Sequence, residues 1–442
     1  MTDLDIGEDT EALDAFELDH IVSSFKVSKL EQISSLKWFE KSVQISKLYR
    51  VAAAESLLEP LPAVERVKES LMAHSKFDHM VRELITVFIW KDNVLKRLLE
   101  VKPEPKVAFP TYMVLYYEVM VHGIVQAMIY HGDTFNYLRE TSDDLVEYCV
   151  LRLRKLLRPL KYVSNESLRN MDDDPIGGIK NQNRYIDFNI GSQCIATLRY
   201  ICENIDSLPL SVSTRIYSTH DLPVLVTQLL HQKIWTKVED GKTYKFNETD
   251  WQELRPDDPP LTKMECQVWL LLRQLLLNTA NNSSYHYSDY RKEQLTKLLK
   301  YLNDRVLDQL SVLVDLQRML HFLHVRAPSE GDKTVHNPLI IEVTPLFQDQ
   351  LIQQYSEKWK DLAVSSSKIL FYCDKDTTMT LAKAFSSSIT SLLNTNGELH
   401  TCNYCMKRAA NRCSQCKRTW YCSRSCQVQH WKIHKISCSS ET

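Results

Sequence analysis

Residues 402–438 read CNYCMKRAANRCSQCKRTWYCSRSCQVQHWKIHKISC, and this segment holds seven of the twelve cysteines in the chain. Metal-ligating residue types recur in it as C-x2-C-x7-C-x2-C-x5-C-x3-C-x7-H-x3-C. Zn²⁺ prefers four thiolate or imidazole ligands in a tetrahedron, and a C-x2-C pair places two sulfurs on one ion with little strain. Eight candidate ligands therefore predict two closed sites. Because a closed site leaves no open position for water, we expect structural zinc rather than catalytic zinc.

The eight candidate ligands are Cys402, Cys405, Cys413, Cys416, Cys422, Cys426, His434 and Cys438. Their spacing alone allows either a sequential or an interleaved distribution between two ions. Disulfide pairing is disfavoured, because seven is an odd number and the N-terminus shows no basic region followed by an apolar one, as a secretory signal would. The spacing therefore predicts a zinc-stabilised domain at the C-terminal end of the chain.

This segment resembles the MYND zinc-finger family in more than its ligands. The strings Trp420-Tyr421-Cys422, Cys426-Gln427 and Trp431-Lys432-Ile433-His434 stand where that family has its aromatic-Cys, Cys-Gln and Trp-x-x-His signatures. The resemblance implies interleaved ligands, with Cys402, Cys405, Cys422 and Cys426 on one ion and Cys413, Cys416, His434 and Cys438 on the other. It also favours His434 over the neighbouring His430 as the histidine ligand.

Members of the MYND family bind short proline-containing peptides by adding a strand against the finger. The positions that match their peptide contacts are Ser414, Gln427 and Trp431. Trp431 could equally form the core of so small a domain, and Ser414 and Gln427 could be ordinary polar surface. The resemblance implies a finger that docks a partner protein and performs no chemistry.

The composition of the whole chain indicates helices. Its 442 residues include 44% hydrophobic and 25% charged residues but only nine glycines. Phosphate-binding loops and nucleophile elbows need glycine, and no G-x-G-x-x-G, G-x-x-x-x-G-K-[ST] or G-x-S-x-G motif is present. We expect an all-α fold, with an armadillo-like helical body and a small cross-braced two-zinc finger. The polar turn, Leu-Pro step and Leu-rich helix of residues 218–230 are typical of stacked helical repeats, although no second copy recurs at a fixed period.

Composition also divides the chain into four parts. Residues 1–22 hold eight acids and no base, which predicts an acidic flexible leader. Residues 23–385 form the predicted helical body, residues 386–397 a Ser- and Asn-rich linker, and residues 398–442 the finger. Within the body, Pro110 suits the first turn of a helix, and residues 164–184 are expected to form a loop. Asp240-Gly241 between alternating segments predicts a β-hairpin over residues 237–246.

Catalytic alternatives have little support in the residues. Some lysine methyltransferases contain a MYND finger, but here His336-Asn337-Pro338 has no Gly-rich cofactor segment to accompany it. Glu118 and His122, spaced i, i+4, could form a metal pair, yet a polar stripe on a packed helix explains them more simply. The run Asp172–Asp174 has neither the central glycine nor the closing Glu of a calcium loop. We therefore expect a protein that is not an enzyme.

Charge and hydropathy limit the choice of partner and compartment. Eight bases and no acid lie between Cys402 and Cys438, but seven thiolates on two zinc ions (−7 + 4 = −3) reduce this charge to about +5. Without a second nucleic-acid-reading module, we expect no specific nucleic-acid binding. The apolar stretch from Tyr112 to Tyr130 is interrupted by Glu118, which favours a core helix over a membrane span. The remaining five cysteines are scattered, as in a protein of the reducing cytoplasm.

Body and finger together resemble a family of cytoplasmic factors that pre-assemble the inner and outer dynein arms of motile cilia. The resemblance is strongest in residues 109–115, 218–235, 266–277 and 306–323 and in the finger. It implies that the partners are dynein chains, other dynein assembly factors, chaperones and co-chaperones. It also implies a location near the centrosome and centriolar satellites or in dynein assembly foci. The residues alone predict only a non-enzymatic adaptor, and they do not predict its oligomeric state.

The competing hypothesis is a nuclear transcriptional co-repressor that uses its finger to bind proline-containing peptides. Some proteins with a MYND finger have this role. The chain contains no run of five or more Lys or Arg residues and no DNA-reading module, which argues against it.

Overall fold

The structure is a computed structural model. It describes residues 13–56, 65–100, 105–138, 140–158, 174–239, 241–247, 250–255, 261–278, 285–325, 346–374, 376–382, 411–416, 419–421, 423–435 and 438. The chain divides into two compact units, Met1–Ser386 and Ser387–Thr442. The first unit is the helical body and the second contains the finger. The predicted linker, residues 386–397, lies outside the described residues.

The body is built from helices of very different length. The longer ones are α1 (Ala15–Ser24), α2 (Leu36–Ser56), α3 (Arg66–Ala73), α4 (Phe77–Trp90), α6 (Phe109–Ile129), α7 (Ser142–Leu156), α9 (Pro175–Glu203), α11 (Leu222–Gln232), α12 (Lys263–Leu277), α14 (Asp289–Thr296), α16 (Val314–Val325), α17 (Phe347–Gln354) and α18 (Trp359–Leu370). Shorter helices and turns are η1 (Leu30–Gln32), η2 (Lys91–Leu95), α5 (Lys96–Glu100), η3 (Gly132–Tyr137), η4 (Ile205–Ser207), α10 (Leu210–Thr214), η5 (Arg215–Thr219), η6 (Lys297–Tyr301), α15 (Asp304–Gln309) and η7 (Ser311–Leu313).

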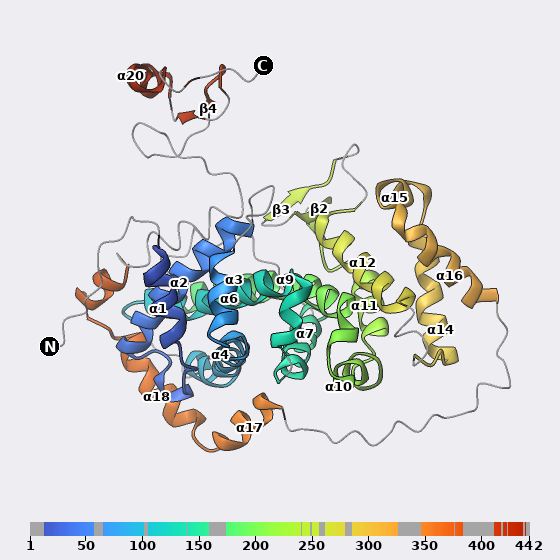
Figure 1. The fold of residues 1–442 in the computed structure, drawn as a ribbon, viewed down its shortest axis with the longest axis horizontal. Coiled ribbons are helices and arrows are strands. Elements are labelled where there is room, and N and C mark those ends of the chain that lie inside the picture. The colour runs from blue at the N-terminus through green and yellow to red at the C-terminus, as the bar shows by residue number, and fades with distance from the viewer. Residues whose placement is uncertain are drawn as a thin grey trace. The chain divides into compact units, whose positions relative to one another are not determined.

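These helices stack side by side, so that helices close in sequence are neighbours in space (Figure 1). In the N-terminal half α2 packs on α6 and α6 on α9, and further along α9 packs on α7 and α12 and α11 packs on α12. The close approach of α2 and α6 requires Gly123, because a Cβ atom there would lie 2.3 Å from the ring of Tyr49. The structure confirms the predicted fold class, an all-α protein with an armadillo-like helical body.

The first helix, α1, overlaps the segment predicted as a flexible leader. The side chain of Asp14 accepts a hydrogen bond from the backbone N–H of Glu17 (2.7 Å) and so caps the helix. Leu18, Ile21 and Val22 are buried, and α1 packs on α3. The predicted leader, residues 1–22, is therefore too long, because apolar residues at helical spacing pack its C-terminal part, which lies in α1, against the body. Residues 1–12 lie outside the described residues.

Helix α9 begins inside the predicted loop over residues 164–184. Asp174 accepts a hydrogen bond from the backbone N–H of Gly177 (2.9 Å), and Pro175 occupies the first helical turn. This combination of an N-cap and a proline starts a helix in spite of two adjacent glycines, so the loop prediction is wrong from residue 175 onward. The corresponding prediction for Pro110 is confirmed, because Pro110 lies in the first turn of α6.

A small antiparallel sheet interrupts the helices. Strands β1 (Thr236–Glu239) and β2 (Lys242–Asn247) form the predicted hairpin, with Glu239 paired to Lys242. Gly241 in its turn has φ +75°, a conformation that glycine adopts without strain. Sequence analysis missed the third strand, β3 (Asp250–Glu253), which pairs with β2. Its four polar and aromatic residues show no alternation long enough to predict a strand.

Helix α6 lies at the centre of the N-terminal half. It is long and apolar enough to cross a membrane by length and composition, and 67% of its most apolar window is buried inside the protein. It packs on α2, α4 and α9, and both Glu118 and His122 on it are fully buried. This packing is that of the core helix expected from the sequence.

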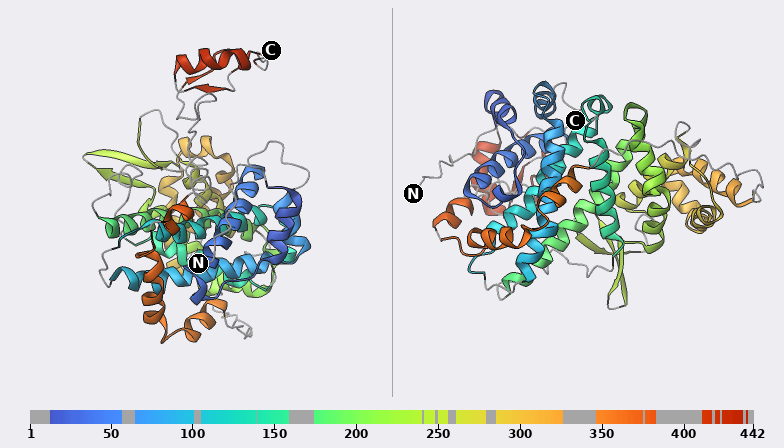
Figure 2. Two further views of the ribbon diagram at one scale, coloured as in Figure 1. Left: turned by 90° about the vertical axis from the view of Figure 1, so that its left-hand side faces the viewer. Right: turned by 90° about the horizontal axis from the view of Figure 1, so that it is seen from below.

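Helices α17 and α18 return to the N-terminal half of the body, where α17 packs on α4 and α18 on α5 and α6 (Figure 2). Hydrogen bonds join distant parts of the chain there. The Tyr355 hydroxyl donates to Glu31 (2.7 Å), the backbone N–H of Phe347 donates to Asp144 (2.8 Å), and the backbone N–H of Lys106 donates to the Phe371 carbonyl (2.9 Å). Segments from the C-terminal part of the body thus pack on helices of its N-terminal half.

Candidate metal centre and docking surface of the finger

The described part of the finger is a short hairpin followed by a helix. Strands β4 (Asn411–Arg412) and β5 (Trp420–Tyr421) pair in antiparallel register, and α20 (Arg424–His434) follows. The hairpin carries the second C-x2-C pair, Cys413 and Cys416, in the turn between its strands. The helix ends on His434, and Cys438 follows four residues later.

These elements bring four predicted ligands together. The ligand atoms of Cys413, Cys416, His434 and Cys438 all lie within 4.8 Å of one another. Cys413 Sγ is 3.8 Å from Cys438 Sγ, and Cys416 Sγ is 3.4 Å from His434 Nε2. Cys413, Cys416 and His434 are buried, and Cys438 is half-buried. Among the described residues of the chain, this is the one group of three or more Cys, His, Asp or Glu side chains that converges in this way.

The distances fit tetrahedral zinc. With Zn–S bonds of about 2.3 Å and Zn–N bonds of about 2.0 Å, a tetrahedron separates two sulfurs by about 3.8 Å and a sulfur from a nitrogen by about 3.5 Å. The cysteines are free thiols, since a disulfide would bring its sulfurs to about 2.0 Å. Three thiolates and one imidazole would complete the coordination shell and leave no open position. The group suits a structural ion.

Two further residues, Thr419 and Tyr421, support this cluster. The Thr419 hydroxyl lies 3.3 Å from His434 Nδ1, and the Thr419 carbonyl accepts a hydrogen bond from the backbone N–H of Cys413 (2.7 Å). Tyr421 is buried in the finger core beside Cys413 and Cys416. A polar partner on the second imidazole nitrogen fixes the ring orientation of a metal-binding histidine. No spacing rule points to Thr419; only its position between ligand cysteines could have suggested it.

The two candidate histidines have different surroundings. His430 Nδ1 lies 3.0 Å from the Tyr421 hydroxyl, and its ring stacks on that of His434. His434 instead directs Nε2 toward the thiol of Cys416. The structure therefore places His434, and not His430, among the cysteines.

The other predicted ligand set is only partly described. Cys426 lies in the first turn of α20 and is half-buried against the finger core. Cys402, Cys405 and Cys422 lie outside the described residues.

The predicted peptide-binding residues lie on the finger surface. Ser414 is exposed in the turn after Cys413. Gln427 and Trp431 lie one turn apart on α20 and therefore share a face of the helix. Trp431 is 40% exposed and its ring meets that of His434 at a centroid distance of 5.8 Å. One face of Trp431 thus packs on the cluster while the other meets solvent.

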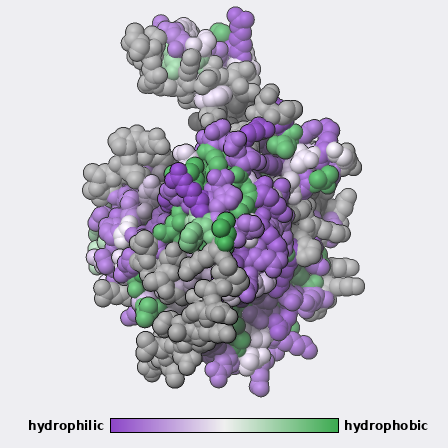
Figure 3. All heavy atoms as spheres, turned by 90° about the vertical axis from the view of Figure 1, so that its right-hand side faces the viewer, coloured by the Kyte–Doolittle hydropathy of each residue, from purple (hydrophilic) through white to green (hydrophobic). Residues whose placement is uncertain are grey.

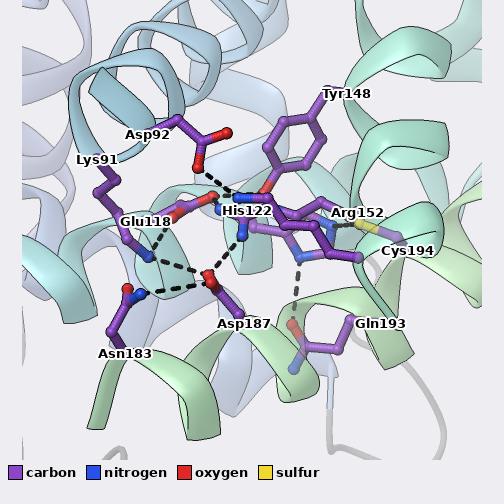
Figure 4. A network of polar contacts seen from close by, with 11 residues as sticks. Lys91, Asp92, Glu118, His122, Tyr148, Arg152, Asn183, Asp187, Gln193 and Cys194 are labelled. Carbon is purple, nitrogen blue, oxygen red and sulfur yellow. Dashed lines mark hydrogen bonds and ion pairs between the residues drawn. The ribbon is translucent and has the colours of Figure 1, made fainter. Parts of the chain in front are cut away.

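The second metal candidate of the sequence, Glu118 with His122, is part of a buried polar network (Figure 4). Glu118 accepts hydrogen bonds from Lys91 (2.7 Å) and from the Tyr148 hydroxyl (2.9 Å) and forms an ion pair with Arg152.

His122 is engaged elsewhere, with its Nδ1 3.2 Å from Gln193 Oε1 and its Nε2 3.7 Å from the Cys194 thiol. The carboxylate and the imidazole thus have separate partners, as expected for a packed polar stripe. Of the other sites considered, Asp174 caps α9, whereas Asp172, Asp173 and His336–Pro338 lie outside the described residues.

The far end of the body exposes apolar side chains. Figure 3 faces the end that contains α14, α15 and α16, where hydrophobic surface appears among hydrophilic residues. Val312 before α16 is 45% exposed, and Phe322 and Val325 on α16 are 63% and 82% exposed. Phe322 and Val325 lie three residues apart on α16 and therefore share a face of that helix.

Comparison with known proteins agrees with this description. The MYND finger family model matches residues 402–438. The zinc finger MYND domain-containing protein 10 homolog of Drosophila melanogaster is 30% identical over 443 residues, which cover 94% of this chain and 96% of that protein.

Fold and site together define a helical adaptor protein with a C-terminal, metal-binding MYND finger. Because the similarity to the fly protein extends through body and finger alike, the family can be stated more narrowly. The chain belongs to the family of zinc finger MYND domain-containing protein 10.

Two further relatives match the chain over a short stretch. Tudor domain-containing protein 1 of Homo sapiens is 50% identical over 38 residues, 9% of this chain and 3% of that protein. N-lysine methyltransferase SMYD2 of Homo sapiens is 36% identical over 50 residues, 11% of this chain and 12% of that enzyme. No solved structure matched the chain. The similarity to the methyltransferase thus covers a small part of either chain.

Proposed function

We propose that this protein is a non-enzymatic adaptor that helps to pre-assemble the inner and outer axonemal dynein arms in the cytoplasm. The observation that carries the proposal is the similarity to the fly protein over 94% of the chain, which includes both the helical body and the finger. The dynein role itself comes from the family resemblance of the sequence. Chaperones, co-chaperones, other assembly factors and dynein chains are the partners that this role requires.

Two structural zinc ions hold the finger in this proposal. The cluster of Cys413, Cys416, His434 and Cys438 supports the interleaved arrangement, because it joins the second cysteine pair of the finger to its last two ligands. A sequential arrangement would instead combine Cys413 and Cys416 with the first pair. The second ion would then bind Cys402, Cys405, Cys422 and Cys426.

The finger docks a partner through the face that holds Gln427 and Trp431, with Ser414 beside Cys413. A half-exposed tryptophan can bury apolar area against a peptide at small entropic cost, and it is a frequent hot spot of protein interfaces. Since both proposed zinc shells are closed, the metal stabilises this surface and has no reacting ligand to supply.

The test uses ciliated cells that lack the protein and measures dynein arms in their axonemes after each variant is expressed. The wild-type chain should restore the arms. Trp431→Ala should retain two zinc ions per chain by elemental analysis. It should bind the partner protein that is captured with the wild-type chain about thirtyfold more weakly, a loss of about 2 kcal/mol. Cys402→Ala should lose zinc as well as binding. If Trp431→Ala loses zinc to the same extent, Trp431 belongs to the finger core and the docking surface lies elsewhere.

The same cells distinguish the nuclear alternative. A tagged chain should lie in the cytoplasm, in assembly foci or near the centrosome. Nuclear accumulation together with intact dynein arms in cells that lack the protein would overturn the proposed function.

A further inference from the structure

A pocket of about 450 Å³ lies at the N-terminal end of the body, between the end of α1, the segment that follows it and the first turns of α2. The buried side chains of Ile21, Phe25, Trp38 and Ile45 contribute its apolar lining. Lys26 and Lys37 line it from exposed positions. The pocket therefore combines an apolar floor with a cationic rim.

A buried carboxylate fixes the walls of this pocket. Glu83 on α4 is fully buried and accepts hydrogen bonds from the Ser28 backbone N–H (2.6 Å), the Ser28 hydroxyl (2.8 Å) and the Tyr117 hydroxyl (2.8 Å). These bonds tie the segment after α1 to helices α4 and α6. A pocket with walls held in this way is formed before any ligand arrives, which lowers the entropic cost of binding.

Lys41 belongs to the wall and is not available to a ligand. Its ammonium group lies 2.7 Å from the Lys26 carbonyl, 2.8 Å from the Ser28 hydroxyl and 2.9 Å from Glu83 Oε2. An ammonium group has three N–H donors, so these three acceptors satisfy it completely. It also lies 4.4 Å from the centre of the Phe25 ring.

The two rim lysines, Lys26 and Lys37, have no such partners among the described residues. Neither Lys26 nor Lys37 forms an ion pair with another residue in the described part of the chain. Glu40 is the one acidic residue among those that line the pocket in the described structure, so the rim retains positive charge. A ligand carboxylate would supply the missing counter-charge.

We propose that this pocket binds a segment of a partner protein in which an apolar side chain is flanked by acidic residues. The apolar side chain would fill the floor, and the flanking carboxylates would pair with Lys26 and Lys37. A membrane is a poorer fit, because the apolar residues lie at the bottom of a hollow and cannot enter a bilayer. The proposal rests on the adaptor role and names a second contact, on the body, that is independent of the finger.

The test uses the purified full-length, zinc-loaded protein and fluorescence anisotropy. The probes are fluorescein-labelled decapeptides with one central Leu, Phe or Trp between Glu residues. Analogues replace Glu by Gln, or the apolar residue by Ser. At least one Glu-rich peptide should bind saturably, and both of its analogues should bind more weakly. Raising the salt concentration should weaken the binding, because the charges lie at the rim.

Two variants and one matched control assign this binding to the pocket. Lys26→Glu combined with Lys37→Glu should weaken it at least tenfold, and Gln44→Trp should block it by filling space, since Gln44 lines the pocket from an exposed position. Lys29→Glu is the control for one of these two charge reversals, because Lys29 is an exposed residue that is not among those lining the pocket, and it should leave affinity within about twofold. Thermal unfolding curves verify that each variant is folded.

Several outcomes would overturn the proposal. They are the absence of saturable binding below about 1 mM, equal weakening by Lys29→Glu, and unchanged binding by Gln44→Trp. Stronger lysine-dependent binding of inorganic phosphate or of vesicles containing phosphatidylserine would also overturn it and indicate an anion or lipid site. Trp431→Ala should not affect peptide binding, so a failure of this proposal can be distinguished from a failure of the finger-docking function.

Discussion

His430 and His434 lie four residues apart on α20, yet only His434 faces the cysteine cluster. We expect His434→Ala to remove one of the two proposed zinc ions from the full-length protein, because it breaks a closed set of four ligands. His430→Ala is the matched control and should retain both ions, since His430 contacts the Tyr421 hydroxyl. Elemental analysis of the purified variants measures the number of zinc ions per chain. Loss of zinc in the control alone would show that His430 is the ligand.

Asp144 is a second residue whose role depends on a distant part of the chain. It accepts a hydrogen bond from the backbone N–H of Phe347, the first residue of α17. Burial raises the pKa of Asp144 from its ordinary value of 3.8 to about 6, although this hydrogen bond opposes the shift. Because the pKa is higher in the folded state, the resulting stabilisation is present below about pH 4. It is lost as the pH rises through about 6.

Asp144→Asn should therefore stabilise the protein at neutral pH. The amide keeps an acceptor oxygen for Phe347 but cannot ionise, so the gain should be on the order of 1 kcal/mol at pH 7.5 after allowance for partial solvent exposure. Near pH 4 the variant and the wild type should unfold at the same temperature. Asp144→Leu, which removes the acceptor, should be less stable than the wild type at both pH values. Thermal unfolding across this pH range decides between these outcomes.

At the scale of elements, three buried charges and one half-buried carboxylate, that of Asp187, join four segments of the body. Lys91 of η2, Glu118 of α6, Arg152 of α7 and Asp187 of α9 alternate in sign and contact one another. Burial lowers the pKa of Lys91 to about 8, and the neighbouring Asp187 limits this shift. For Asp187 burial acts in the opposite sense, but Lys91 and Arg152 outweigh it and hold the pKa of Asp187 below its ordinary range.

Removal of one partner from this network should be strongly destabilising. Lys91→Met would remove from Glu118 and Asp187 a cation that pairs with both, and we expect the free energy of unfolding to fall by about 3–5 kcal/mol. Lys297→Met is the control, because it breaks an exposed pair with Glu293 that is worth about 0.5 kcal/mol or less. Urea unfolding measures the loss in free energy of unfolding for each variant relative to the wild type. Equal losses would show that the buried network contributes no more than a surface pair.

At the scale of the whole molecule, the chain consists of two compact units, and the boundary between them along the sequence follows Ser386. Residues 1–385 should therefore fold cooperatively without the finger, with the helix content and unfolding temperature of the body in the intact chain. A strong chelator should unfold the finger of the full-length protein and leave the body intact, because metal binding supplies the folding energy of so small a domain. Circular dichroism measures the helix content and unfolding temperature of residues 1–385, and of the full-length protein with and without chelator. Aggregation of residues 1–385 would indicate that the body needs the finger.

The sequence by itself determined the features that depend on neighbouring residues. The spacing of Cys and His residues predicts the finger, the scarcity of glycine predicts helices, and Asp240-Gly241 predicts the turn of the hairpin. Each of these signals is a property of the sequence itself, so it does not depend on which distant residues come into contact. Residues 15–22 and 175–184 show the limit of such signals, because acidic or glycine-containing sequence still forms helix where a cap and buried apolar residues favour it.

Tertiary structure decided which distant residues meet. Spacing allowed two distributions of the zinc ligands, and Cys413 and Cys416 reach His434 and Cys438 only because the hairpin folds against α20. The bond from Phe347 to Asp144 spans 203 residues, and the bond from Tyr355 to Glu31 spans 324. The pocket beside α1 depends in the same way on Glu83, which lies 55 residues from the Ser28 that it holds. Such contacts form because packing of whole helices brings their donors and acceptors together, and no local sequence pattern predicts them.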